Sequence, residues 1–131
     1  MSEKTIRTSQ KTILYVEDNE FNRKIVRQLL AKTKYKLREA HDGESAVQTA
    51  LGDPPDLILM DVQLPKMSGL DATRQLRADA RTAAIPIVVI TSYALSGDAQ
   101  KAQEAGATAY LAKPYSPRDL LAKIRELVPE A

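Results

Sequence analysis

The stretch LILMD at residues 57–61 sets four apolar residues directly before an acid. A short, continuous apolar run is typical of a strand that is buried on both faces of a parallel sheet. The breaker Gly-Asp-Pro-Pro at 52–55 precedes the run and Leu64-Pro65 follows it, so the predicted strand is bounded on both sides. Asp61 therefore stands at the carboxyl end of a buried strand.

Four more strand-length runs lie on either side of this stretch. Each strand is followed by residues whose apolar positions recur at helical spacing. Strict alternation predicts an α/β fold, a doubly wound, five-stranded parallel sheet with helices on both faces. The predicted strands are 13–16, 37–40 (half-polar, expected near an edge), 57–60, 85–90 and 107–111. The helical faces hold Phe21, Ile25, Val26, Leu29 and Leu30; Ala46, Val47, Ala50 and Leu51; Leu70, Thr73 and Leu76 after the N-cap Ser68; the Ala-rich run 98–105 closed by Gly106; and Leu120, Leu121, Ile124, Leu127 and Val128.

The length of 131 residues suits one domain. Residues 1–10 are polar and rich in Ser, Thr and Lys, so we expect a flexible N-terminal tail. The domain itself is predicted over 11–128, with 129–131 as the C-terminal end. No output domain is expected after Ala131, so a signal has to leave through a protein contact or a relay.

Composition excludes several classes of protein. The chain has no cysteine, which removes disulfides, thiolate zinc sites and thiol chemistry. Its 19 Lys and Arg against 17 Asp and Glu give a net charge of +2, which argues against a nucleic-acid binder. The N-terminal residues lack the apolar core of a signal peptide, and no apolar run approaches the roughly 20 residues of a membrane span. We therefore expect a cytoplasmic protein.

Polar residues stand at four strand ends of the predicted sheet. Glu17 and Asp18 follow the first strand, Asp61 ends the third, Thr91 follows the fourth and Lys113 follows the last. The carboxyl ends of parallel strands meet at one edge of the sheet, where ligands bind in folds of this kind. We therefore expect three acids, a hydroxyl and an ammonium to gather there.

Crowded carboxylates repel each other, so either one is protonated or a cation is bound. Mg²⁺ suits such a site because it takes oxygen ligands from one or two carboxylates together with phosphate oxygens. Asp61 can then act as ligand and nucleophile together, since attack of a carboxylate on phosphorus gives an aspartyl phosphate. The Lys113 ammonium and the Thr91 hydroxyl can pair with phosphoryl oxygens.

Each of these residues also has an ordinary interpretation. Glu17 and Asp18 can simply favour the dipole of the next helix, and either Asp18 or Asn19 can cap it. Thr91 can be a β-branched residue at a strand end, and Lys113 a surface lysine. The joint pattern favours the functional hypothesis, because chance rarely sets these residue types at four strand ends in order.

Two other features have structural interpretations. His41 is the only histidine and lies beside Asp42-Gly43, so we interpret it as a loop residue and not as a phosphorelay histidine. The basic residues Arg23, Lys24 and Arg27 are interpreted as the solvated face of one helix.

Taken together, the chain resembles the receiver domain of two-component response regulators over about 11–128. The matching segments are ILYVEDNE, HDGESAV, LILMD followed by VQLPKMSGLD, IVVITSYA and GATAYLAKP. The resemblance implies a flavodoxin-like (βα)5 fold with strand order 2-1-3-4-5. It also implies that Asp61 is the phosphoacceptor and that Mg²⁺ is the cofactor. The implied metal ligands are Glu17, Asp18, Asp61 and the backbone carbonyl of Gln63.

The same resemblance implies the remaining roles. Thr91 and Lys113 are the implied phosphate contacts. Tyr110 takes the place of an aromatic switch residue, which turns inward when Thr91 moves toward the phosphoryl group. The Lys113–Pro114 peptide bond is implied to be cis. Gln63 and Tyr93 flank the site at positions that tune the lifetime of the phosphoryl group in the family.

One residue departs from the commonest pattern of the family. The first position of the acid pair is usually Asp, and here it is Glu17. A longer side chain can move the metal ion or admit a water molecule, so the departure concerns the geometry of the site.

The function implied by the resemblance is that of a stand-alone response regulator. Asp61 would accept a phosphoryl group from a sensor histidine kinase or a histidine phosphotransfer protein, with self-catalysed transfer and slow autodephosphorylation as its only chemistry. The partner would be a downstream protein or another phosphate carrier, with no direct nucleic-acid or membrane contact, and the chain a monomer or weak homodimer. The read-out surface is expected at the helix after Ser96, the last strand and the last helix.

Two alternatives remain. An interaction scaffold that is never phosphorylated would have the same fold. An aspartate-nucleophile phosphatase usually needs a second acid two residues after the nucleophile, where this chain has Gln63.

Overall fold

The computed structural model describes residues 10–92 and 97–130. The tail predicted over 1–10 lies outside this part of the chain except for Gln10, and so do Tyr93 and Ser96. None of the helices in the described part has both the length and the apolar character needed to span a bilayer.

Strands and helices alternate strictly along these residues. The strands are β2 (Thr12–Val16), β3 (Lys36–Ala40), β4 (Leu57–Asp61), β5 (Ile87–Thr91) and β6 (Ala109–Ala112). The helices are α1 (Glu20–Leu30), α2 (Gly43–Gly52), α3 (Gly69–Ala78), α4 (Asp98–Ala105) and α5 (Pro117–Leu127).

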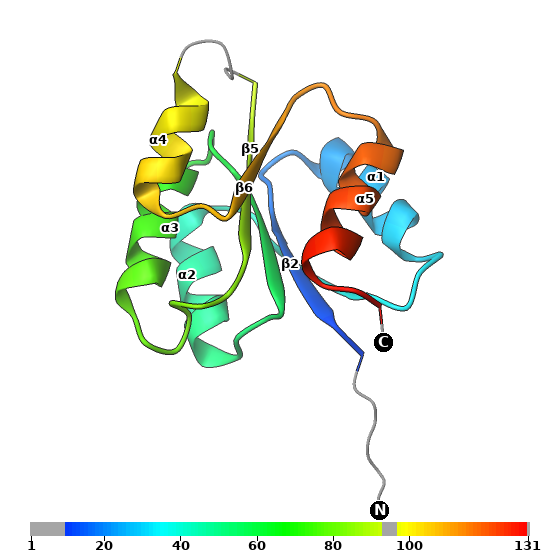
Figure 1. Cartoon of the computed structure of the whole chain (residues 1–131), viewed down its shortest axis with the longest axis horizontal. Helices are drawn as coiled ribbons and strands as arrows, with labels where there is room; N and C mark the ends of the chain where they lie inside the picture. The colour runs from blue at the N-terminus through cyan, green and yellow to red at the C-terminus, as the bar shows by residue number, and fades with distance from the viewer. Residues whose placement is uncertain (1–9, 93–96, 131) are drawn as a thin grey trace, which may run out of the picture.

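All neighbouring strands pair in parallel, in the order β3-β2-β4-β5-β6. Counted along the chain this is the order 2-1-3-4-5, so the predicted flavodoxin-like topology is confirmed (Figure 1). The half-polar strand β3 lies at one edge, as its sequence predicts, because an edge strand is less completely covered. The switch in strand order falls between β2 and β4, and their carboxyl ends therefore form the crevice used by folds of this kind.

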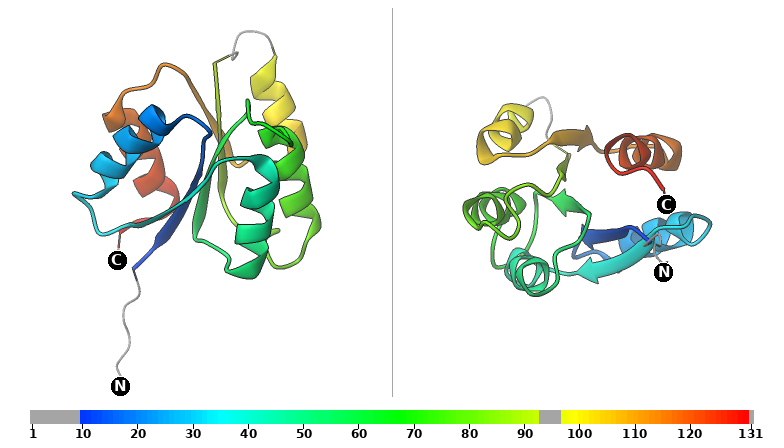
Figure 2. Two further views of the ribbon diagram at one scale, coloured as in Figure 1. Left: turned by 180° about the vertical axis from the view of Figure 1, so that it is seen from behind. Right: turned by 60° about the horizontal axis from the view of Figure 1, so that its bottom comes forward.

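Helices cover both faces of the sheet, with α1 and α5 on one side and α2, α3 and α4 on the other (Figure 2). Alternation of side chains along each strand divides the core accordingly. On β2, Leu14 and Val16 pack in the cluster with α2 and α3, whereas Ile13 and Tyr15 pack in the cluster with α1 and α5. The central strands β4 and β5 are buried at every position, which explains their continuous apolar sequence.

Four helices begin at a side chain that accepts a hydrogen bond from the backbone three residues on. Each such cap satisfies an N–H group that the helix leaves without a partner and stabilises the helix by about 1 kcal/mol. The caps are Asn19, Asp42, Ser68 and Ser116. The predicted cap at Ser68 is therefore observed.

The last two strands begin two residues later than their apolar runs predict. The N–H of Ile85 donates to the carbonyl of Thr82 and belongs to a turn, and Pro86 has no N–H to give to a ladder. The N–H of Ala107 donates to the carbonyl of Ala102 and so closes α4. The strands predicted at 85–90 and 107–111 were therefore wrong at their first residues, because the N–H groups of Ile85 and Ala107 are bonded within a turn and a helix end.

Gly69 provides a test of how closely α3 packs below Asp61. A Cβ atom added at Gly69 would lie 1.9 Å from the backbone carbonyl oxygen of Asp61, whereas one added at Gly52 would meet nothing within 4 Å. We expect Gly69→Ala to lower the free energy of unfolding by about 2–3 kcal/mol, because backbone has to move. The matched change Gly52→Ala should leave it unchanged or raise it slightly. Urea unfolding followed by circular dichroism measures both, and equal midpoints for the two variants would contradict the packing described.

Candidate functional site

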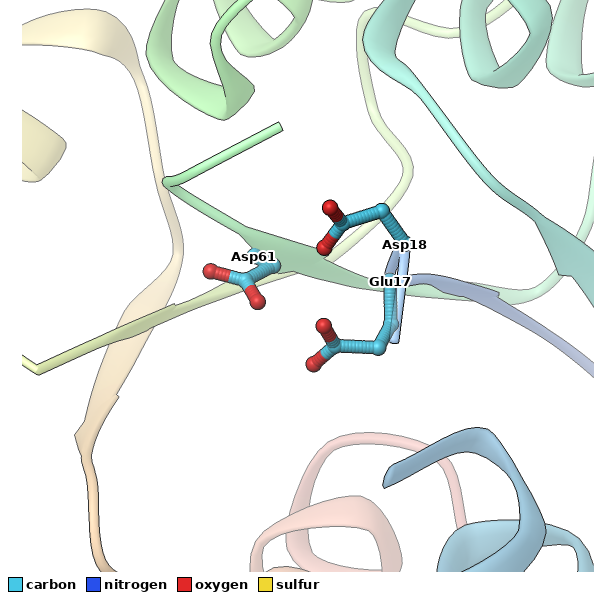
Figure 3. Close-up of side chains that lie close together, drawn as sticks. All are labelled: Glu17, Asp18 and Asp61. Carbon is cyan, nitrogen blue, oxygen red and sulfur yellow. The ribbon is translucent and has the colours of Figure 1, made fainter. Parts of the chain in front are cut away.

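The polar residues predicted at the strand ends do meet at one edge of the sheet. Glu17 and Asp18 follow β2 directly, and Asp61 is the last residue of β4. Their three carboxylate groups face a common space beyond the two strands (Figure 3). One oxygen from each lies within 4.8 Å of the others, and Glu17 and Asp61 are only 2% and 3% exposed. The structure therefore concentrates negative charge where water has little access.

Two donors fix the orientation of the Asp61 carboxylate. Its Oδ1 accepts a hydrogen bond of 3.0 Å from the backbone N–H of Gln63. Its Oδ2 accepts one of 2.9 Å from the Nζ of Lys113. The carboxylate is thus held by one donor from its own loop and one from the far side of β5.

Lys113 is the cation that faces the acid cluster. Its Nζ lies 2.9 Å from Asp61 and 3.4 Å from Glu17. Burial by itself lowers the pKa of this ammonium, but the hydrogen bond and charge of Asp61 together with Glu17 raise the pKa overall, so it stays charged. The backbone N–H of Lys113 donates to the Thr91 carbonyl at 2.7 Å, and the Lys113–Pro114 peptide bond is cis.

Glu17 is the acid whose ionisation the site opposes. Burial raises the pKa of its carboxyl group, and the neighbouring Asp61 raises it further. The attraction of Lys113 and a hydrogen bond from the N–H of Asn19 act in the opposite direction without cancelling the rise. The hydroxyl of Tyr15 also donates to Oε1, at 3.3 Å. An additional positive charge at this edge would therefore stabilise the ionised cluster.

The structure shows which residue caps α1. Asn19 is the cap of α1, since its Oδ1 accepts a hydrogen bond of 2.9 Å from the N–H of Asn22. Asp18 is not needed as a cap and lies exposed at the open side of the cluster. The pair thus supplies one buried and one accessible carboxylate.

Arg23 corrects the view of α1 as a plain solvated face. It is only 7% exposed, and its Nη1 donates to the backbone carbonyl of Glu17 at 2.7 Å. Its Nη2 pairs with Glu20 at 2.8 Å, and its Nε lies 3.3 Å from Glu39. The prediction treated three basic residues alike because helical spacing alone does not show which of them points back toward the β2–α1 loop.

The site fits Mg²⁺ in its donor chemistry. All the clustered ligand atoms are carboxylate oxygens, the donors that Mg²⁺ prefers. In an octahedral shell, neighbouring oxygens lie roughly 3 Å and opposite ones roughly 4 Å apart. The three acids, each within 4.8 Å of the others, are therefore spaced on the scale of one coordination shell.

Thr91 and Tyr110 lie on the neighbouring strands. Thr91 is the last residue of β5 and is 1% exposed, one position beyond the residue that pairs with Asp61. Tyr110 on β6 is 46% exposed and borders a hollow of about 370 Å³ between α4 and β6. Gln63 is exposed next to Asp61, and His41 is an exposed residue after β3.

Sequence reasoning missed three residues that support the cluster: Tyr15, Tyr115 and Arg23. Burial raises the pKa of both tyrosine hydroxyls above the ordinary value, so both remain protonated. The period-two alternation of a strand sets Tyr15 and Glu17 on the same side of β2, and this signal could have identified the first of the three. Tyr115 comes from the far end of the chain and gives no such signal.

A sheet of this strand order, with acids and a lysine at its carboxyl edge, defines the class of receiver domains. Residues 13–125 match the family model described as a response regulator receiver domain, and the chain belongs to this family. Members of the family act as phosphoacceptor switches.

Relatives and solved structures agree with this assignment. The chain is 36% identical over 121 residues to the polar-differentiation response regulator DivK of Brucella ovis, covering 92% of this chain and 98% of that protein. It is 35% identical to the receiver domain of the sensor histidine kinase PA1611 of Pseudomonas aeruginosa, with a TM-score of 0.85 over 91% of this chain and 98% of that one. That structure has a magnesium ion coordinated in the active-site cleft. The chemotaxis response regulator CheY4 of Vibrio cholerae superposes with a TM-score of 0.86 at 28% identity, over 92% of this chain and 100% of that one.

The raised pKa of Glu17 predicts a pH dependence of stability. Because folding raises this pKa above 4.5, the unfolded chain releases the proton at a lower pH than the folded one does. Without divalent metal, the free energy of unfolding should therefore fall as pH rises from 4.5 through the folded pKa. Glu17→Gln should remove this fall and leave the metal-free domain more stable than the wild type near neutral pH.

Urea unfolding in the presence of a chelator, from mildly acidic to neutral pH, measures this effect. The exposed acid Glu126 on α5 provides the matched control Glu126→Gln, which should keep the fall seen in the wild type. A Glu17→Gln variant that loses stability with pH as steeply as the wild type would show that the cluster does not oppose ionisation of Glu17.

Proposed function

We propose that Asp61 accepts a phosphoryl group, in a Mg²⁺-dependent reaction, from a phosphohistidine on a sensor histidine kinase or a histidine phosphotransfer protein. The observation that carries this proposal is the contact of 2.9 Å between Asp61 Oδ2 and Lys113 Nζ beside two further acids. A buried, oriented carboxylate next to a fixed cation is what in-line phosphoryl transfer requires. The phosphorylated domain then signals by protein contact or by relay.

Asp61 acts as the nucleophile. One of its carboxylate oxygens forms a bond to phosphorus while the bond from phosphorus to the donor nitrogen breaks, and the imidazole keeps that electron pair. The Gln63 N–H and the Lys113 ammonium hold the carboxylate in one orientation before the donor arrives. The nucleophile is therefore already aligned in the folded domain, and less entropy is lost when the donor binds.

The phosphoryl oxygens need positive charge and donors. Glu17, Asp18, Asp61 and the backbone carbonyl of Gln63 would hold Mg²⁺, which neutralises phosphoryl charge when bound. Lys113 can shift its ammonium from Asp61 to a phosphoryl oxygen without changing its backbone position, and the hydroxyl of Thr91 would donate to another. Gln63 offers no general acid at the position where phosphatases of this type carry one, which supports a switch and not a turnover enzyme.

The surface beside the acids suits a helical phosphodonor. Phe21 and Ile25, in the first turns of α1, are 70% and 39% exposed although both are apolar. Ile25 lines a cavity of about 520 Å³ between α1 and α5, whose wall also includes Lys113 and Tyr115. Exposed apolar side chains at the rim of a reaction site are typical of a protein interface. We propose that this face receives the donor protein.

The part of the molecule formed by α4 and β6 suits the binding of a downstream protein. The described buried anchors of α4 are the small residues Ala102 and Ala105, so this helix is held by little apolar area. Thr91 ends β5 just before the segment that leads to α4, and its carbonyl is bonded to the N–H of Lys113. A new phosphate contact by Thr91 would bias Tyr110 and α4 toward a second arrangement. The downstream protein would bind there, and a cytoplasmic location remains a prediction.

Phosphorylation can be tested by incubating the chain with Mg²⁺ and acetyl phosphate and measuring the intact mass. We expect the mass of one added phosphoryl group, dependent on Mg²⁺ and absent from Asp61→Asn. The exposed acid Asp71 of α3 provides the matched control Asp71→Asn, which should be phosphorylated like the wild type. A wild type that remains unmodified would favour the interaction scaffold, and rapid multiple turnover of donor would favour the phosphatase.

The donor face predicts a difference between small and protein donors. Phe21→Ala removes an exposed apolar side chain, so the fold and the acids should remain intact. We expect phosphorylation by acetyl phosphate to be unchanged and transfer from a phosphohistidine protein to slow by about 10-fold or more, as for an interface hot spot. Rapid-quench measurements with both donors give the two rates. Gln28→Ala, at another exposed position of α1, is the control, and equal rates for both variants would place the donor elsewhere.

A further inference from the structure

A pair of tyrosine hydroxyls lies beneath Glu17 and has no part in the reaction proposed above. Tyr15 is the fourth residue of β2 and is 0% exposed. A hydroxyl group buried to this extent needs a hydrogen-bond partner. It donates to Oε1 of Glu17, at 3.3 Å. A fully buried hydroxyl on this side of the core therefore points at one of the acids.

Strand geometry makes this contact a consequence of spacing. Tyr15 and Glu17 are two residues apart, so their side chains leave the same face of β2, toward α1 and α5. Tyr15 packs there with Leu59 of β4, whose own neighbour at the same spacing is Asp61. The aromatic ring fills the core, while its hydroxyl reaches the floor of the acid cluster.

Tyr115 continues the contact outward. It follows Pro114 in the loop between β6 and α5, lines the cavity between α1 and α5, and sets its hydroxyl next to that of Tyr15. A tyrosine hydroxyl has one proton to donate. If Tyr15 gives its proton to Glu17, then Tyr115 can donate to the Tyr15 oxygen, and the two hydroxyls form a chain that ends at the carboxylate.

Glutamate needs such support more than aspartate does. Its side chain has one more rotatable bond, so its carboxylate loses more conformational entropy when it is fixed as a metal ligand. The hydroxyl of Tyr15 and the ammonium of Lys113 donate to Oε1 of Glu17, and the N–H of Asn19 donates to Oε2. The hydroxyl is the donor among them that comes from the protein core.

From this arrangement we infer that Tyr15, supported by Tyr115, is a positioning residue that holds the Glu17 carboxylate in place for Mg²⁺. The inference rests on the proposed function, since it takes Glu17 as a ligand. It accounts for the presence of Glu at a position where Asp is commoner, because a longer acid gains a fixed orientation from a donor beneath it. Partners that orient metal ligands typically change metal affinity by about 10- to 100-fold when removed.

The test measures Mg²⁺ affinity in the absence of any phosphodonor, by titration of backbone amide chemical shifts. Tyr15→Phe keeps the ring and removes the hydroxyl. We expect its Mg²⁺ dissociation constant to rise about 10-fold, and that of Tyr115→Phe to rise by a smaller factor. Tyr35→Phe is the matched control, because Tyr35 is also buried and its hydroxyl donates to the Val128 carbonyl, and its affinity should equal that of the wild type.

A double-mutant cycle separates positioning from general damage to the core. In Glu17→Asp the carboxylate is one methylene shorter and is drawn back from the hydroxyl of Tyr15. Adding Tyr15→Phe to this variant should therefore change the dissociation constant by no more than about 2-fold, because the interaction that it removes is already lost. An undiminished effect of Tyr15→Phe in the Asp background would overturn the inference.

A spectroscopic signature provides an independent readout. The chain has no Trp, so its near-ultraviolet absorption comes chiefly from 5 Tyr. Mg²⁺ should perturb this absorption in the wild type and in Tyr35→Phe, and the perturbation should be lost in Tyr15→Phe.

The outcomes distinguish this inference from the proposed function. A Tyr15→Phe variant that is less stable but binds Mg²⁺ like Tyr35→Phe would make the hydroxyl purely structural and overturn the inference alone. A wild type that neither binds Mg²⁺ nor is phosphorylated would overturn the proposed function, and the inference with it. If Tyr15→Phe fails to fold, the half-buried Tyr115→Phe serves as the test variant. An unchanged Mg²⁺ affinity of Tyr115→Phe would then overturn the inference.

Discussion

The ion pair between Asp61 and Lys113 is the interaction on which the rest of this edge depends. Two of the three clustered carboxylates are almost fully buried, and buried charges are tolerated only when they are paired and hydrogen-bonded. Lys113, directly after the last strand, supplies the pairing across β5 from Asp61, so the strands must pair in the correct order before the acids can be held together. One contact thus links the topology of the fold to the chemistry of its edge.

The donors around the cluster come from different levels of structure. The N–H of Gln63 and the N–H of Asn19 are local, because each lies two residues from the carboxylate it serves. The guanidinium of Arg23 reaches back from α1 to the backbone of Glu17, and the hydroxyl of Tyr15 reaches up from the core. The acids are therefore oriented before any ligand arrives, which is the arrangement expected of a site that relies on electrostatics and positioning.

The helices before and after β6 differ in how firmly they are held. On one face, α1 and α5 enclose a cavity beside Lys113, and large buried side chains such as Leu120 and Ile124 anchor α5. On the other, α4 is anchored by alanines and borders a hollow next to Tyr110. A charge added at the shared edge would displace α4 more easily than α5, since local stability follows buried apolar contact.

The sequence by itself determined the order of the elements and the residue types at the strand ends. A short apolar run such as 57–60 with breakers on both sides indicates a buried strand, and an acid or lysine after such a strand lies at the carboxyl edge of a parallel sheet. It did not determine where β5 and β6 begin, since the bonds of Ile85 and Ala107 are made within turns. Nor did it separate the buried Arg23 from its exposed neighbours, or bring Tyr115 to Tyr15 across the chain. Those facts depend on which side chains meet once the helices are packed, and contacts between residues distant in sequence are set by tertiary structure alone.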